Sequence, residues 1–198
     1  MLENLRERFE GPLRARLEPV VEWLAMRQVT PNQVTLAALG LSLLAALCIG
    51  AGWLRLGALV LIVAGLGDLL DGMLARATDQ TSPFGAFFDS TLDRISEGAV
   101  LAAVAYRFAG DGQPLLVALV VLALLGSLLV SYTRARAEAL GIDCKVGLMS
   151  RAERTVLLIA GLLLGLLGPV IVLLAVLSLY TVGQRMQHVR EALANPSD

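Results

Sequence analysis

Long apolar runs separated by short polar breaks dominate the chain. The runs fall near residues 33–53, 57–75, 86–108, 115–133, 153–167 and 169–186. A helix needs about 20 mostly apolar residues to cross the hydrocarbon of a bilayer. The pattern therefore predicts an all-α polytopic membrane protein, with six transmembrane helices packed into one core over residues 33–186.

The last two runs are separated only by the segment Gly165-Leu166-Leu167-Gly168-Pro169. Six helices require a tight turn at this segment, whereas the alternative is five spans with one very long final helix. Pro169 argues against the long helix, because an interior proline removes a backbone hydrogen bond and clashes with the preceding turn.

The N-terminal region has a different pattern, in which apolar side chains recur every three or four positions between arginines. The apolar residues are Leu2, Leu5, Phe9, Leu13, Leu17 and Val20, and the arginines are Arg6, Arg8, Arg14 and Arg16. This spacing predicts an amphipathic helix over residues 1–28 that lies in the membrane interface. No cleavable signal peptide is expected, because residues 1–18 are charged throughout. Residues 187–198 are expected to form a polar tail, and the whole of 1–198 a single membrane domain.

Composition strengthens the membrane interpretation. Hydrophobic residues make up 57% of the 198-residue chain and charged residues 17%, against about 45–50% and about 25% in soluble domains. The net charge of −1 provides no basic field for a nucleic-acid partner. Two cysteines and one histidine argue against a zinc cage or a disulfide framework.

The cations are unevenly distributed between the two sides of the predicted bundle. They gather before the first span, between the fourth and fifth spans, and after the sixth, whereas the opposite loops contain only Arg55 and Arg107. The positive-inside rule then places both termini and the loops 76–85 and 134–154 in the cytoplasm. We expect an integral protein of the cell membrane, in contact with membrane lipids, with its site on the cytoplasmic side.

Four aspartates lie within the apolar runs. Asp68 and Asp71 are three residues apart and Asp89 and Asp93 four apart, so each pair shares one helix face. An intramembrane carboxylate is costly and marks a functional site by default. Adjacent antiparallel helices would bring both pairs to one level, where carboxylates suit Mg²⁺ or Mn²⁺. Two ions would suit phosphoryl chemistry, while solvated helix-end acids or a cation path are the alternatives.

Residues close to these acids also suit a phosphate-containing ligand. Gly72 and Gly85 remove side chains where a ligand would approach the backbone, and Arg76 can bind a phosphate oxygen.

Together these residues read Asp68-x2-Asp71-Gly72-x2-Ala75-Arg76-x8-Gly85-x3-Asp89-x3-Asp93. The segment resembles, without a departure, the signature of the CDP-alcohol phosphotransferase family. The six-span layout with an amphipathic N-terminal helix is also similar to that family. The resemblance implies an enzyme that transfers a phosphatidyl-type group from a CDP-linked lipid, such as CDP-diacylglycerol, to an alcohol and releases CMP.

The resemblance also implies roles for individual residues. Asp68, Asp71 and Asp89 would bind metal, and Asp93 would contact metal and act as the general base. The CDP-lipid would be bound by Asp71, Gly72, Ala75, Arg76 and Gly85, together with the segment Thr30-Pro31-Asn32-x2-Thr35, which resembles the family's segment before the first span.

The segments 131–138 and 151–154 resemble the branch of the family that uses inositol 1-phosphate, which includes the phosphatidylinositol phosphate synthases and their archaeal relatives. Arg134, Arg154 and Arg185 match the positions that bind the acceptor's phosphate there. The chain departs from the branch in two ways, because Arg134 often is lysine there and because the stretch 150–154 lacks the usual proline. Glycerol 3-phosphate is the second candidate acceptor.

Two other classes of function remain alternatives at this point. A cation transporter would use the acid pairs for permeation but would leave the glycines and Arg76 unexplained, and a catalytically silent lipid-binding scaffold would not need the intact acid set. The resemblance further implies a homodimer.

Overall fold

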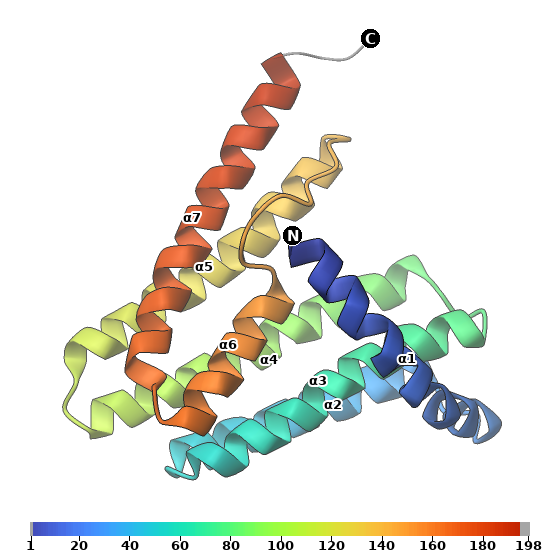
Figure 1. Cartoon of the computed structure of the whole chain (residues 1–198), viewed down its shortest axis with the longest axis horizontal. Coiled ribbons are helices and arrows are strands. Elements are labelled where there is room, and N and C mark those ends of the chain that lie inside the picture. Colours follow the sequence, from blue (N-terminus) through green and yellow to red (C-terminus); the bar gives the residue numbers. More distant parts are fainter. Residues whose placement is uncertain (1, 195–198) are drawn as a thin grey trace. The chain divides into compact units, whose positions relative to one another are not determined.

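The structure is a computed structural model that describes the backbone of residues 2–194; the side chains of 2–10, 12 and 13 lie outside the described part. The described residues form helices and contain no strand (Figure 1). The helices are α1 (Leu2–Met26), α2 (Pro31–Gly50), α3 (Leu54–Ala77), α4 (Pro83–Gly110), α5 (Pro114–Ala139), α6 (Arg151–Leu164) and α7 (Leu167–Ala194). The predicted all-α class is confirmed, and most of each predicted apolar run lies on a helix of its own.

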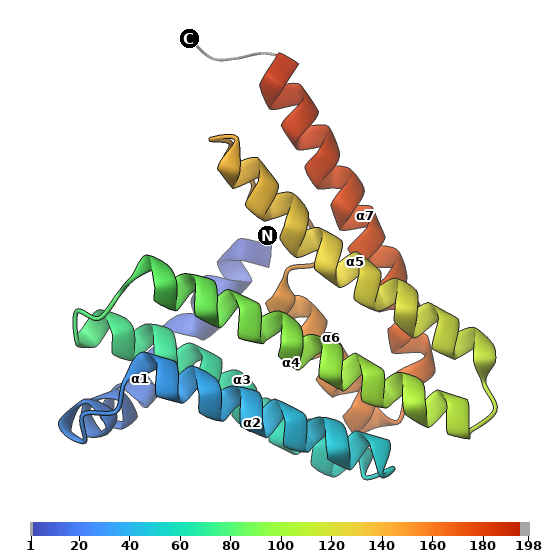
Figure 2. The same ribbon diagram turned by 180° about the vertical axis from the view of Figure 1, so that it is seen from behind.

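The chain divides into two compact units. Unit 1 comprises Met1–Leu41 and Ile62–Ile95, and unit 2 comprises Ser42–Leu61 and Ser96–Asp198. Within unit 2, α7 packs along α5 and also contacts α6, as the two opposite views show (Figures 1 and 2). The prediction of a single domain stays a prediction.

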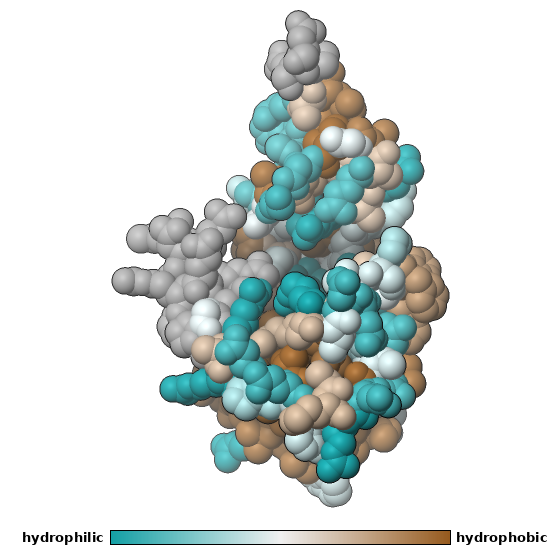
Figure 3. Space-filling model, turned by 90° about the vertical axis from the view of Figure 1, so that its right-hand side faces the viewer, coloured by the Kyte–Doolittle hydropathy of each residue, from teal (hydrophilic) through white to brown (hydrophobic). Residues whose placement is uncertain are grey.

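Four of the described helices are long and apolar enough to cross a membrane, namely α2, α3, α5 and α7. Helix α6 has only 14 residues, and α4 carries charged residues such as Asp89 and Asp93 along its N-terminal half. Large apolar side chains lie on the surface, for example Leu47 at 71% exposure, and apolar surface is visible in Figure 3. These features define an integral membrane protein, while the count of six spans stays a prediction.

The tight turn expected between the last two runs is present. Helix α6 ends at Leu164, and the following Gly165 has a φ of +71°, in the left-handed region that favours glycine. Helix α7 begins at Leu167, so Pro169 lies in its first turn, where proline is tolerated. The alternative of one very long helix is therefore wrong.

The expected interfacial helix and the expected polar tail both lie partly outside the described residues. Helix α1 covers most of the expected 1–28 segment, but the amphipathic pattern of its first ten residues lies outside the described side chains. At the other end, α7 continues to Ala194, so residues 187–194 of the expected tail are helical, and the boundary of the tail stays a prediction. No proline or glycine interrupts 187–194, and Gln187 donates a 2.8 Å hydrogen bond to Glu191 one turn later. Residues 195–198 lie outside the described part.

Gly161 allows α6 and α7 to approach each other closely. A Cβ at this position would lie 2.8–3.1 Å from three atoms of the Val170 side chain. We expect Gly161→Ala to destabilise the folded protein by about 1–3 kcal/mol, the usual cost of overpacking, as a lower unfolding midpoint in detergent. Gly40→Ala is the control, because nothing lies within 4 Å of its Cβ position. An equal effect of both substitutions would contradict this account.

Candidate active site

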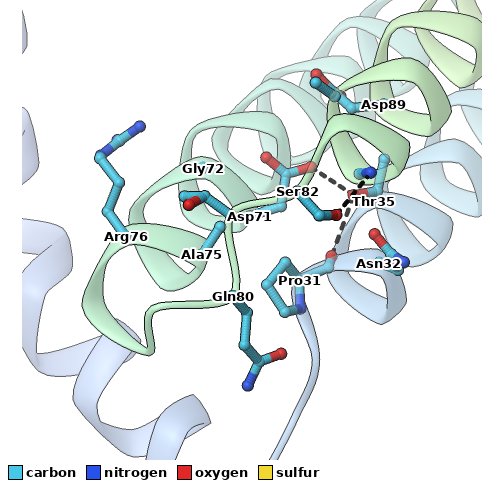
Figure 4. A pocket seen from close by; sticks show the side chains of 13 residues that line it. Pro31, Asn32, Thr35, Asp71, Gly72, Ala75, Arg76, Gln80, Ser82 and Asp89 are labelled. Atoms are coloured by element: carbon cyan, nitrogen blue, oxygen red, sulfur yellow. Dashed lines mark hydrogen bonds between the residues drawn. The ribbon is translucent and has the colours of Figure 1, made fainter.

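A cavity of about 180 Å³ lies in unit 1, at the N-terminal ends of α2 and α4 and beside the C-terminal part of α3 (Figure 4). It is lined by Pro31, Asn32, Thr35, Asp71, Gly72, Ala75, Arg76, Gln80, Thr81, Ser82, Gly85, Ala86 and Asp89. Residues far apart in the sequence thus surround one space.

Local sequence signals fix both helix starts at this cavity. Before α2, the backbone N–H of Thr30 donates to Gln33 Oε1 at 2.9 Å, while Thr30 Oγ1 accepts from the Gln33 backbone at 3.4 Å. This reciprocal pair is a capping box. Before α4, Ser82 Oγ accepts from the backbone N–H of Gly85 at 3.0 Å. Each cap is followed by proline as the first helical residue, which fits that position. Helix N-termini attract anions, so two of them favour a phosphate-containing ligand.

Asp71 is the buried carboxylate of the cavity, with 6% exposure. Its Oδ2 accepts a 2.8 Å hydrogen bond from the Thr35 hydroxyl, which lies 3.1 Å from the carbonyl oxygen of Pro31 (Figure 4). The charges of Asp68 and Asp89 are close enough to interact with Asp71. These carboxylates therefore contribute a negative electrostatic potential around Asp71.

Arg76 supplies the cationic part of the cavity lining. Its guanidinium nitrogens lie 3.5 and 3.8 Å from the place where a Cβ of Gly72 would be. Across the cavity, a Cβ of Gly85 would lie 3.1 Å from Ser82 Oγ and 3.8 Å from Asn32 Oδ1. Side chains at either glycine would occupy the space between the polar groups.

The convergence of all four carboxylates on a bound metal stays a prediction. Among the described residues, no three histidine, cysteine, aspartate or glutamate side chains are gathered so that they could hold a metal ion. Only Asp71 and Asp89 of the four line the cavity. Carboxylates repel one another, and two of them face other groups: Asp71 faces Thr35, and Asp93 Oδ2 lies 3.7 Å from Arg94 Nη1. The donor set itself consists of hard oxygens, which fits Mg²⁺ or Mn²⁺.

The structure brings together eight of the nine residues expected to bind the CDP-lipid. The exception is Thr30, which caps α2 instead of lining the cavity. Sequence reasoning missed Gln80, Thr81, Ser82 and Ala86. The serine-proline pair at 82–83 was a readable signal, because it is a typical helix start.

The three arginines expected to bind the acceptor's phosphate all belong to unit 2 and differ in their surroundings. Arg154 is buried and forms an ion pair with Glu97, with its Nε 2.7 Å and its Nη2 2.9 Å from the two carboxylate oxygens. Arg154 lies in the first turn of α6, where the helix dipole disfavours a cation. Glu97 supplies the compensating charge.

Arg185 is buried at 4% exposure, and both of its described hydrogen bonds end on backbone carbonyls. Its Nε donates to the carbonyl of Val146 at 3.0 Å, and its Nη1 donates to the carbonyl of Val130. The charges of Arg134 and Arg154 are near enough to interact with it. The charge of Glu138 also interacts with Arg185, but among the described residues no carboxylate forms an ion pair with it. A buried cation without an ion-pair partner is expensive, which favours an anionic ligand here.

The loop between α5 and α6 is held by polar side chains on one face of α7. Thr181 Oγ1 accepts from the backbone N–H of Met149 at 3.1 Å, and Gln184 Oε1 accepts from that of Leu148 at 3.3 Å. In the same loop, the ammonium of Lys145 hydrogen-bonds the Asp143 carboxylate and lowers its pKa. The loop that contacts Arg185 is therefore anchored to α7.

Arg134 lies at the surface, half-exposed. Its Nε forms a 2.8 Å ion pair with Glu138 one turn later on α5. Exposed pairs of this kind contribute little to stability, so this guanidinium can change partner at low cost.

The sequence model of the CDP-alcohol phosphatidyltransferase family matches residues 28–182. The chain therefore belongs to this family of enzymes, and the predicted resemblance is confirmed.

The chain is also similar to individual enzymes that are named as inositol phosphate lipid synthases. An archaetidylinositol phosphate synthase of Methanothermobacter thermautotrophicus is 37% identical over 197 residues, covering 96% of this chain and 97% of the relative. A phosphatidylinositol phosphate synthase of Cutibacterium acnes is 37% identical over 150 residues, covering 75% and 72%.

The fold is similar to that of the Mycobacterium tuberculosis phosphatidylinositol phosphate synthase, at 34% identity. Its crystal structure with CDP-DAG bound gives a TM-score of 0.82 and covers 86% of this chain and 92% of that chain. Its structure in complex with manganese and citrate gives a TM-score of 0.81, covering 87% and 88%. Membership in a family of enzymes favours catalysis over the transporter and the silent scaffold.

Proposed function

We propose that the protein transfers the phosphatidyl group of a CDP-diacylglycerol-type lipid to a hydroxyl of a phosphorylated polyol, with inositol 1-phosphate favoured, and releases CMP. The observation that carries this proposal is the cavity of unit 1. It gathers the predicted CDP-lipid residues around a carboxylate, a guanidinium and two helix N-termini. Membership in the family and the names of the relatives support the same reaction.

The donor's diphosphate would lie at the N-termini of α2 and α4 and against Arg76, which can donate two parallel hydrogen bonds to phosphate oxygens. The cavity, at about 180 Å³, is smaller than the roughly 300–1,000 Å³ usual for drug-sized ligands. It would therefore enclose part of the head group, leaving the lipid tails in the membrane.

Asp68, Asp71, Asp89 and Asp93 would hold the metal, Mg²⁺ or Mn²⁺, as two ions. When bound, the ions neutralise the diphosphate and stabilise the leaving phosphate of CMP. The presence of manganese in a structure of a relative supports this assignment.

Asp93 would act as the general base, taking the proton from the acceptor hydroxyl. A bond forms between that hydroxyl oxygen and the phosphorus that bears the diacylglycerol. The bond from this phosphorus to the bridging oxygen of the diphosphate breaks, and the electron pair leaves with CMP.

The acceptor's phosphate would be bound in unit 2, chiefly by Arg185 with Arg134 and Arg154. A neutral alcohol would leave the buried Arg185 without an ion-pair partner among the described residues. Glycerol 3-phosphate fits the same charge and is the second candidate.

The same proposal includes the membrane arrangement. α1 would lie in the interface, six helices would span the cell membrane, and both termini would face the cytoplasm, in accordance with the distribution of arginines. A homodimer is proposed from the family resemblance.

The proposal is tested by supplying the purified protein with CDP-diacylglycerol, Mg²⁺ and, in separate reactions, inositol 1-phosphate, glycerol 3-phosphate or free inositol. CMP release that requires inositol 1-phosphate is the expected result. Release with glycerol 3-phosphate alone would replace the acceptor, and release with free inositol alone would contradict a phosphorylated acceptor.

Removing divalent metal should abolish turnover. Dialysis against EDTA is expected to reduce CMP release to background, and added Mg²⁺ or Mn²⁺ should restore it, because the aspartates cannot neutralise a diphosphate by themselves. Full activity after complete metal removal, verified by elemental analysis, would contradict the metal assignment.

A further inference from the structure

The ion pair between Glu97 on α4 and Arg154 on α6 lies within unit 2. Both carboxylate oxygens of Glu97 are used, at 2.7 and 2.9 Å. The Arg154 side chain is 4% exposed and that of Glu97 16%. This two-point contact fixes the plane of the guanidinium as well as its position.

A third contact completes the restraint on Arg154. Its Nη1 donates to the carbonyl oxygen of Met149 at 3.2 Å. An arginine has five N–H donors, and these contacts use one on Nε and one on each terminal nitrogen. Among the contacts of the described residues, one further donor therefore remains on each terminal nitrogen. Donors on the two terminal nitrogens of an arginine can bind a pair of anionic oxygens as a fork.

We propose that Glu97 is a positioning residue for the acceptor. It holds the Arg154 guanidinium so that the fork on the terminal nitrogens is directed at the phosphate of the phosphorylated polyol. This inference rests on the proposed function, and it adds a residue that does not itself touch the substrate.

Glu97 also lowers the net positive charge of the group formed by Arg134, Arg154 and Arg185. It matches the charge of Arg154, whereas the hydrogen bonds of the buried Arg185 end on backbone carbonyls. Arg185 then supplies most of the attraction for the phosphate, and Arg154 supplies direction. Loss of Glu97 should therefore weaken acceptor binding even though it raises the net positive charge, which simple attraction would not predict.

The test compares steady-state kinetics of Glu97→Gln with those of the unsubstituted protein. The KM for inositol 1-phosphate should rise about tenfold or more, the order expected for losing a hydrogen bond to a charged group. The kcat and the KM for CDP-diacylglycerol should change little. Asp111→Asn is the matched control, because Asp111 forms an exposed ion pair with Arg107 at 2.9 Å elsewhere in unit 2.

A double substitution separates positioning from general stabilisation. If Glu97 acts through Arg154, Glu97→Gln combined with Arg154→Gln should have the acceptor KM of Arg154→Gln alone. The inference would be overturned if the two substitutions had additive effects or if Glu97→Gln left the acceptor KM unchanged. It would also be overturned if Glu97→Gln lowered kcat and the affinities for acceptor and donor in parallel. If Glu97→Gln fails to fold, Glu97→Asp replaces it. Aspartate keeps the negative charge but places it one methylene farther from Arg154, so the acceptor KM should still rise selectively.

A failure of the proposed function can be distinguished from a failure of this inference. If the proposed function is wrong, the unsubstituted protein releases no CMP with either phosphorylated acceptor. If glycerol 3-phosphate is the acceptor, the same kinetic comparison is made with it.

Discussion

Asp93→Asn should lower the rate of CMP release by about 10²–10⁴-fold, the usual contribution of a general base. The amide has nearly the shape of the carboxylate but cannot take the proton of the acceptor hydroxyl. The Asp93 side chain is 13% exposed and lies 3.7 Å from Arg94, so the substitution weakens this ion pair without opening a cavity. The fold should therefore persist while the reaction stops.

The measurement is CMP release at saturating concentrations of both substrates, together with metal content after gel filtration. Asp111→Asn makes the same chemical change at an exposed ion pair of unit 2 and should retain full turnover. Near-normal turnover of Asp93→Asn, with metal still bound, would remove Asp93 from the role of base.

Arg185→Gln should raise the KM for inositol 1-phosphate by about ten- to a hundredfold, because a hydrogen bond between charged groups is worth about 1.5–3 kcal/mol. The expected KM for CDP-diacylglycerol is unchanged, since the cavity that would bind the donor is built from other residues. Arg185 also anchors two backbone carbonyls, so the selective change in acceptor KM distinguishes binding from a structural role.

Arg190→Gln is the control for Arg185, because it removes an exposed arginine from the same helix. Its kinetics should match those of the unsubstituted protein. An unchanged acceptor KM in Arg185→Gln, or an equal rise in the KM for both substrates, would contradict a phosphate-binding role.

The helices were predictable because their signals are local. The apolar runs locate the helices of the core, and Pro31 and Pro83 each begin a helix that the structure shows. Helix ends were less predictable. The run ending at residue 186 continues as helix to Ala194, because helix-forming polar residues extend a helix as readily as apolar ones.

The cavity of unit 1 was predictable because one short motif supplies most of its lining. The surroundings of the arginines were not. Glu97 and Arg154 are 57 residues apart, and no periodicity in the sequence pairs them. The contacts of Arg185 are with backbone carbonyls, which leave no trace in residue identity. The convergence of the four carboxylates on a metal stays a prediction, since spacing shows a shared helix face but not which partner each side chain selects.

The central claim is that an acceptor hydroxyl attacks the lipid-bearing phosphorus of the donor. The most direct test supplies inositol 1-phosphate with ¹⁸O in its hydroxyl groups and analyses both products by mass spectrometry. The expected products are a phosphatidylinositol phosphate that retains every ¹⁸O atom and an equal amount of unlabelled CMP. Label in CMP, or CMP release without the labelled lipid, would contradict it.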